Sequence, residues 1–173
     1  MKPRVVFSQC MLGVRCRYDG KCSVKESVRD EACARGWIPV CPEVLGGLTT
    51  PRPPAERIGD RVMNCEGGDV TENYRRGAEE ALKIAQLYGA KYALLKERSP
   101  SCGCGEIYDG TFSGTRIAGD GVTAALFKEN GIQVFGVVEQ VFKFGCNVGE
   151  IGNIVEIDGR EHILRYHFFN HIF

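Results

Sequence analysis

The sequence predicts an α/β fold with a mostly parallel sheet, and three observations support this. Short β-branched and aromatic runs alternate with helical segments, which is the pattern of consecutive β-α-β units. Three of these runs lead into loops rich in glycine and cysteine, as strands do where a parallel sheet binds ligands. The length of 173 residues is that of one compact domain with one core.

The first elements are short and end in marked turns. Residues 4–7 are β-branched or aromatic and predict a buried strand. Residues 23–26 have the spacing of a capping box, which predicts a helix that ends before Gly36. Residues 37–41 predict a second strand, and Pro39 favours an edge position for it.

The middle of the chain contains the longest predicted helix. Residues 42–60 are rich in Pro and Gly without a period and predict a loop, and residues 61–64 predict a short strand or hairpin arm. A helix from about residue 71 to residue 88 follows, then a central strand at 91–95 and a second loop at 97–119. The expected apolar face of this helix consists of Ala78, Ala81, Leu82, Ala85 and Leu87.

The last elements complete a Rossmann-like three-layer arrangement with helices on both faces of the sheet. A helix over 121–130 precedes a final buried strand at 132–138. Residues 141–173 break the pattern and predict a short C-terminal appendage. Within it, residues 153–157 and 162–166 are a possible β-hairpin around an Asp-Gly turn.

Composition and charge exclude several classes of partner. Lys and Arg number 22, as do Asp and Glu, so the formal net charge is zero and no basic cluster predicts binding to a nucleic-acid polymer or an anionic membrane. No run of about eighteen apolar residues occurs, and Ser8 and Gln9 interrupt the first apolar stretch. We therefore expect a cytoplasmic protein that acts on a small molecule, with the oligomeric state left open.

Nine cysteines are more than a core of this size needs, and an odd count without a secretion signal argues against a disulfide framework. Cys10, Cys41 and Cys102 each follow a predicted strand, so their loops meet at one sheet edge if the first strand is central. Three thiolates from separate loops are typical of a metal site or an iron–sulfur cluster. The alternative is three buried cysteines that act as small apolar side chains.

Long motifs surround these cysteines and carry a resemblance to a known family. They are residues 8–13 (SQCMLG), 16–20 (CRYDG), 39–48 (PVCPEVLGGL), 51–52 (PR), 96–103 (KERSPSCG) and 108–114 (YDGTFSG). Together they closely resemble the former DUF523 family, which is associated with thiouracil desulfidases. The resemblance runs from residue 4 to about residue 140.

The resemblance implies a catalytic iron–sulfur domain over residues 1–140, whereas 141–173 lie outside it as an extension of unknown role. It implies a [4Fe–4S] cluster held by Cys10, Cys41 and Cys102, with one iron not ligated by the protein. It also implies the activity of a non-redox desulfidase. Such an enzyme converts a thiolated pyrimidine (a 2-thiouracil-type base, nucleoside or nucleotide) to the oxo-pyrimidine and hydrogen sulfide.

Two polar residues are expected to assist this reaction. Glu43 lies two residues after Cys41 and is the expected general acid and base, because water must be activated and the ring nitrogen protonated. Ser99 lies three residues before Cys102 and is expected to position water or substrate. The alternatives are a solvated carboxylate or helix cap at Glu43 and a local turn bond at Ser99.

Other residues near the cysteines have weaker claims. Cys16 and Cys104 are possible extra thiols, and Cys104 is expected to be a bystander because it points away from Cys102. A nucleotide phosphate is a possible ligand of the nearby cations, which are Arg17, Arg52, Lys96 and Arg98.

Two competing functions stay open at this point. One is a cysteine-based sulfur-transfer or redox protein without a cluster, which would be colourless and active in air. The other is a non-catalytic metal-binding sensor module, which would hold metal without turning over a thiolated base.

Overall fold

The computed structural model describes residues 4–24, 26–137, 154–157 and 160–163. Its centre is a parallel sheet in the order β2-β1-β5-β8. The four strands are β1 (Val5–Ser8), β2 (Ile38–Val40), β5 (Tyr92–Lys96) and β8 (Gln133–Val137). The α/β class and the parallel sheet are confirmed, and β2 with its Pro39 lies at the predicted edge.

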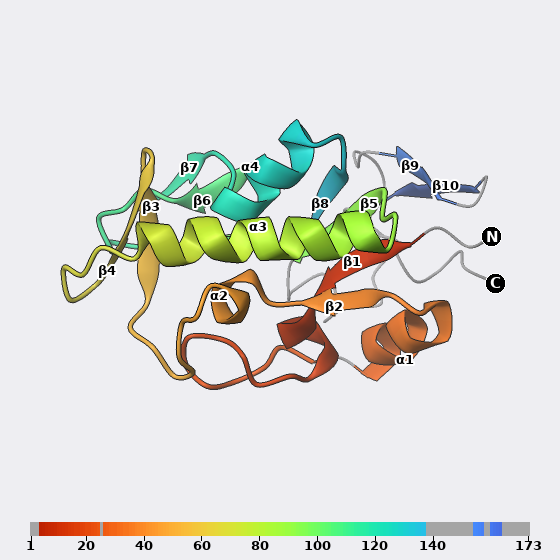
Figure 1. The fold of residues 1–173 in the computed structure, drawn as a ribbon, viewed down its shortest axis with the longest axis horizontal. Helices are drawn as coiled ribbons and strands as arrows, with labels where there is room; N and C mark the ends of the chain where they lie inside the picture. Colours follow the sequence, from red (N-terminus) through yellow and green to blue (C-terminus); the bar gives the residue numbers. More distant parts are fainter. Residues whose placement is uncertain (1–3, 25, 138–153, 158–159, 164–173) are drawn as a thin grey trace.

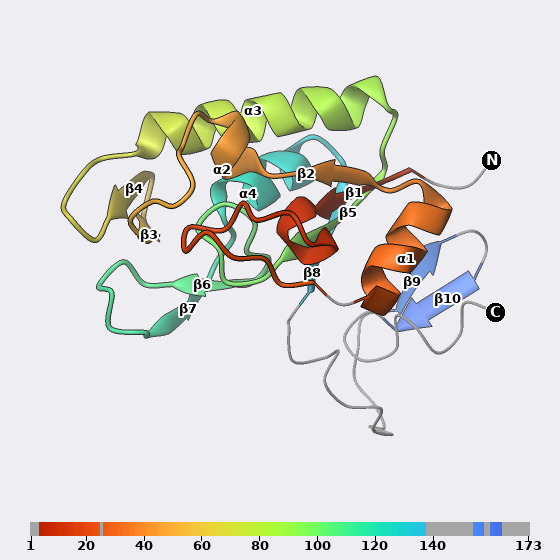
Figure 2. The ribbon, with the colours of Figure 1, turned by 90° about the horizontal axis from the view of Figure 1, so that it is seen from below.

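Helices cover both faces of the sheet and make three layers (Figures 1 and 2). The long α3 and the shorter α4 lie on one face, whereas α1 and the 3-10 turn η1 lie on the other. The helices are η1 (Gln9–Leu12), α1 (Glu26–Arg35), α2 (Pro42–Leu45), α3 (Thr71–Leu87) and α4 (Val122–Glu129). None of the helices in the described ranges is long and apolar enough to cross a membrane.

The central strand β1 supplies side chains to both layers of the core. Val6 points toward α3 and α4, whereas Val5 and Phe7 point toward η1 and α1, and all three are almost fully buried. Phe7 stacks on Trp37 with ring centroids 5.0 Å apart. A strand buried on both faces has no polar alternation, which explains the continuous apolar run in the sequence.

The α3 helix packs through small residues along one stripe. Ala78, Ala81 and Ala85 are fully buried at helical spacing. The carboxylate of Asp69 accepts hydrogen bonds from the backbone and the hydroxyl of Thr71 at the start of the helix. The prediction of Leu87 on the buried face is wrong, since its side chain is 80% exposed. Leu87 lies two residues after Ala85, which turns it away from the stripe.

The two segments predicted as loops contain regular structure. Residues 42–60 include α2 and the strand β3 (Ala55–Ile58), which pairs with β4 (Arg61–Asn64). Residues 97–119 include a hairpin of β6 (Glu106–Tyr108) and β7 (Arg116–Ala118). Both hairpins lie at the same end of the molecule (Figure 1), beyond the sheet.

The C-terminal hairpin is present, with a register different from the predicted one. Strand β9 (Ile154–Ile157) pairs antiparallel with β10 (Arg160–Ile163), and Ile157 lies opposite Arg160. The second strand therefore begins at Arg160 and not at residue 162. The rest of the 141–173 extension lies outside the described residues.

Candidate functional site

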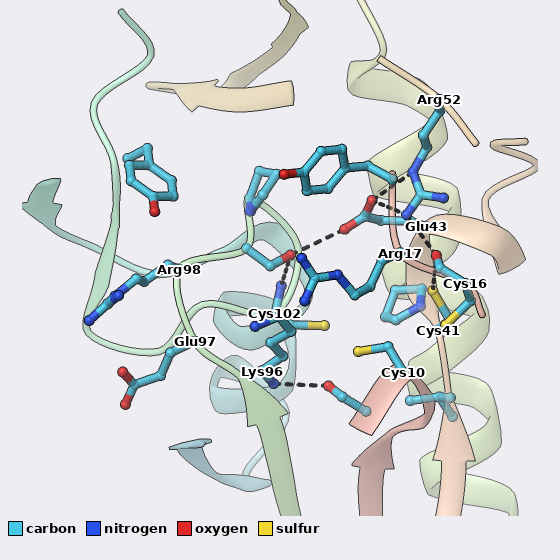
Figure 3. A pocket seen from close by; sticks show the side chains of 17 residues that line it. Cys10, Cys16, Arg17, Cys41, Glu43, Arg52, Lys96, Glu97, Arg98 and Cys102 are labelled. Atoms are coloured by element: carbon cyan, nitrogen blue, oxygen red, sulfur yellow. Dashed lines mark hydrogen bonds and ion pairs between the residues drawn. The ribbon is translucent and has the colours of Figure 1, made fainter. Parts of the chain in front are cut away.

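The three predicted cysteine loops meet at one pocket because β1 lies between β2 and β5. Cys10 lies on η1 directly after β1, Cys41 lies between β2 and α2, and Cys102 lies in the loop after β5. All three line a cavity of about 290 Å³. Figure 3 shows the sulfur atoms of Cys10 and Cys102 pointing into the same space, with Cys41 and Cys16 together at its side. The structure thus brings the predicted ligands together.

Cys10 is placed by a tight turn at the end of β1. The 3-10 turn that carries it closes at Gly13, whose φ of 101° is in the left-handed region where glycine is favoured. The carbonyl of Cys10 accepts a hydrogen bond of 2.8 Å from the backbone of Ser23. Its side chain is 9% exposed, so the thiol reaches the pocket from the protein interior.

Cys41 and Glu43 are placed by direct packing of the short α2 on the backbone of α3. A Cβ atom at Gly77 would lie 1.9 Å from the carbonyl oxygen of Pro42. A Cβ atom at Gly46 would lie 2.0 Å from the carbonyl oxygen of Asn73. Only glycine permits such a close approach of two backbones. Gly77 therefore sets the distance between α2 and α3, and this distance determines the positions of Cys41 and Glu43.

This packing gives a testable expectation for Gly77→Ala. In an exposed helix this change would stabilise the fold by about 1 kcal/mol. Here we expect a loss of about 3 kcal/mol or more, because the methyl group overlaps backbone and not a movable side chain. Urea unfolding measures the change, and Glu79→Ala on the exposed face of the same helix is the control. A more stable Gly77→Ala variant would show that α2 does not pack this closely.

The Cys102 loop is held by Ser99. The Ser99 hydroxyl accepts hydrogen bonds from the backbone of Ser101 at 3.0 Å and of Cys102 at 3.1 Å. The local turn bond considered from the sequence is therefore present. The same hydroxyl also donates a hydrogen bond of 3.1 Å to Glu43. Ser99 thus holds the backbone of the Cys102 loop and also contacts the candidate catalytic carboxylate of Glu43.

Glu43 is held on both carboxylate oxygens. Oε1 accepts the hydrogen bond from Ser99, and Oε2 accepts hydrogen bonds of 2.9 and 2.5 Å from Arg52. The side chains of Glu43 and Arg52 are 14% and 6% exposed. The alternative of a solvated carboxylate is therefore wrong, because tertiary contacts bury Glu43 against the pocket.

Tyr74 of α3 is buried and lies next to Glu43 and Arg52. Burial and the negative charge of Glu43 raise the pKa of the Tyr74 hydroxyl far above its ordinary value. Sequence reasoning missed Tyr74, and its only sequence signal is its helical spacing from Ala78 and Ala81.

Cys16 is a fourth thiol in the pocket, in contact with Cys10 and Cys41. The hydrogen bond with Cys10 raises the pKa of Cys16 to about 11. The hydrogen bond with Cys16, together with burial, raises the pKa of Cys41 well above its ordinary value. Burial raises the pKa of Cys102 to about 12. These thiols are therefore neutral at pH 7 without a bound cation, and binding of a metal would release protons.

The chemistry of the donor set suits an iron–sulfur cluster. Among the described residues, no group of three or more Cys, His, Asp or Glu side chains is close enough to hold one ion. A structural zinc site requires about 2.3 Å from one ion to every thiolate. In an iron–sulfur cluster, different irons take different thiolates, which suits Cys10, Cys41 and Cys102 around one cavity.

Several arginines of the pocket already have carboxylate partners. Arg17 pairs with Asp19 at 3.2 Å and Arg98 pairs with Glu106 at 3.2 Å. Arg52 is the partner of Glu43. These contacts give no direct support to a phosphate site at these arginines.

The structure separates Cys104 from the pocket, as expected. Its thiol lies 3.4 Å from the carbonyl oxygen of Val134 and packs against the core under α3 and α4. Cys104 therefore does not share the space into which Cys102 points. A sulfur relay between Cys102 and Cys104 has no support in this arrangement.

Comparisons with known proteins point to one family. The model of the family described as 2-thiouracil desulfurase matches residues 5–139. The chain is 44% identical over 140 residues to the uncharacterized protein YbbK of Bacillus subtilis (strain 168), which covers 75% of this chain and 93% of that protein. A solved structure described as the [4Fe-4S]-dependent thiouracil desulfidase TudS (DUF523Vcz) is 49% identical. It covers 78% of this chain and 91% of its own, with a TM-score of 0.75.

Proposed function

This chain belongs to the 2-thiouracil desulfurase family, and on that premise we propose that it removes sulfur from a thiolated pyrimidine. The family indicated by the sequence motifs is thereby confirmed. One observation carries the proposal: Cys10, Cys41 and Cys102 line the same cavity as Glu43 and Ser99. In the proposed reaction, thiocarbonyl and water give carbonyl and hydrogen sulfide. The carbon changes its partner from sulfur to oxygen, and no electrons are gained or lost.

The proposed cofactor is a [4Fe–4S] cluster held by Cys10, Cys41 and Cys102. When bound, the cluster supplies a Lewis-acidic iron without a protein ligand for the thiocarbonyl sulfur. The burial of Cys10 and Cys102, the partial burial of Cys41 and their placement on three separate loops support this ligand set. Cys16 and Cys104 are not part of it.

Glu43 and Ser99 are proposed to handle the protons. An ionised carboxylate accepts protons, so Glu43 can take one from the attacking water and return it to a ring nitrogen. Ser99, whose hydroxyl donates to Oε1 of Glu43 at 3.1 Å, is proposed to position that water by exchanging this hydrogen bond for one to the water. Both side chains line the cavity, and Glu43 forms an ion pair with Arg52. We also propose that the substrate is a small molecule and that the protein acts in the cytoplasm. In this proposal it binds neither a nucleic-acid polymer nor a membrane.

The test uses protein purified and reconstituted without oxygen. We expect a brown protein with about four irons and four sulfides per chain, as in a [4Fe–4S] cluster, that releases sulfide from 2-thiouracil and loses colour and activity in air. Parallel assays with the thiolated base, nucleoside and nucleotide identify the form of the substrate. A colourless protein active in air would favour a thiol-based sulfur-transfer protein. A stable cluster whose spectrum ignores both thiouracil and sulfide, without turnover, would favour a sensor module.

A further inference from the structure

The Arg52 side chain donates five hydrogen bonds at the pocket. Its Nη2 atom donates a hydrogen bond of 3.0 Å to the carbonyl of Cys16. Its Nη1 atom donates to the carbonyl of Thr49 at 3.0 Å and to the hydroxyl of Thr50 at 3.2 Å. The Nε and Nη2 atoms hold Oε2 of Glu43. With 6% of the side chain exposed, the guanidinium is fixed by the protein and not by solvent.

The contacts of Arg52 belong to a continuous polar chain across the pocket (Figure 3). The chain runs from the carbonyl of Cys16 to Arg52, then to Glu43 and Ser99, and ends at the backbone N–H of Cys102. Its ends lie in the loops after β1 and β5, and Glu43 lies in the segment after β2. One polar chain therefore connects the three loops that carry the predicted ligands.

We propose that Arg52 is a positioning residue for the desulfidase reaction. It orients the Glu43 carboxylate toward the cavity and joins the Cys16 segment to it. The inference rests on the proposed function for the catalytic role of Glu43. Arg52 acts through Glu43, because its donors are occupied by that carboxylate, by the backbone carbonyls of Cys16 and Thr49, and by the Thr50 hydroxyl.

The geometry also explains why an arginine is needed. The two edges of a guanidinium point in fixed directions, so one group can bind Glu43 and the Cys16 carbonyl together. The ammonium of a lysine has the same charge without this planar arrangement. Arg52→Lys should therefore recover only part of what Arg52→Ala loses.

The decisive experiment is a double-mutant cycle between Arg52→Ala and Glu43→Gln on the reconstituted protein, with kcat expressed per intact cluster. Misplacement of a catalytic group costs about a hundredfold, so we expect such a fall in kcat for Arg52→Ala with little change in KM. The double variant should stay within about threefold of Glu43→Gln, because residues that act as a unit are not additive. Independent effects, which would multiply to about ten-thousandfold, would overturn the inference.

A matched control is Arg57→Ala. Arg57 lies near Arg52 in the chain and also donates to carbonyls, those of Gly59 at 2.8 Å and Asp120 at 2.7 Å, without lining the pocket. Its effect on kcat should be small, and it should combine independently with Glu43→Gln. An Arg57→Ala variant as slow as Arg52→Ala would also overturn the specific role of Arg52.

The same cycle is measured on the urea midpoint of the full chain, followed through the fluorescence of the single, buried Trp37. Arg52→Ala leaves the Glu43 carboxylate buried without its cation, and Glu43→Gln leaves the Arg52 guanidinium buried without its counter-charge. The double variant should therefore unfold at no lower urea concentration than the less stable single variant. If the wild-type protein released no sulfide, the proposed function would fail, while this measurement would still test the coupling. If the changes in urea midpoint of the two single variants add up in the double variant, the coupling is overturned. If Arg52→Ala does not fold, Arg52→Lys takes its place in the cycle.

Discussion

The variants Cys10→Ser, Cys41→Ser and Cys102→Ser are each expected to lose most of the iron and sulfide of the reconstituted protein, and the desulfidase turnover with it. A serine hydroxyl stays protonated near neutral pH and lacks the soft sulfur that iron–sulfur clusters require. Loss of a residue that only supports a ligand already costs roughly 10- to 100-fold in metal affinity, so loss of a ligand should cost more. Iron and sulfide analysis together with the visible spectrum measures the effect.

Two other cysteines serve as matched controls. Cys33 is exposed on α1, and Cys33→Ser should retain the full cluster. Cys16 lines the same pocket and contacts Cys10 and Cys41, yet it is outside the proposed ligand set. Cys16→Ser should therefore also retain the cluster. Full iron and sulfide in all three variants of the first group would show that the ligand assignment is wrong.

The parts of the fold that follow from the sequence are those with strong periodicity. The strands β1 and β5 are buried on both faces and are continuous apolar runs in the sequence, and the partly buried edge strand β8 is also mostly apolar. The α2 helix and the strands β3, β6 and β7 have three or four residues each. Such segments carry too few side chains for a period, and tertiary contacts hold them. One such contact is buried Glu56, which accepts hydrogen bonds from the backbone of Gly110 and Phe112.

Some features of the candidate site also follow from the sequence, and others do not. The convergence of the cysteine loops follows from the strand order, since ligands gather at the carboxyl edge of a parallel sheet. The pairing of Arg52 with Glu43 does not follow, because the chain between them folds back in a way that no local signal specifies. The same is true of Gly77, whose need for glycine arises only from Pro42, which is 35 residues earlier in the chain.

The carboxylate itself is tested by Glu43→Gln, for which we expect turnover to fall by roughly a hundredfold or more with the cluster intact. Glutamine keeps the shape but has one acceptor oxygen in place of two, so it can accept from Arg52 or from Ser99 and not from both, and it cannot take up a proton at neutral pH. The measurement is sulfide release from 2-thiouracil per intact cluster. Iron and sulfide content must accompany it, because a misassembled site would imitate a catalytic defect.

Ser99→Ala completes the test of proton handling. If Ser99 only orients water, its loss should be less harmful than that of Glu43, and if it relays the proton the two losses should be similar. The variant also removes the acceptor for the backbone N–H of Cys102, so a lowered cluster content is expected beside the kinetic effect. Near-normal turnover of Glu43→Gln with a full cluster would remove Glu43 from the mechanism. The proton acceptor would then be sought at Ser99 or at Glu97, which lines the same cavity.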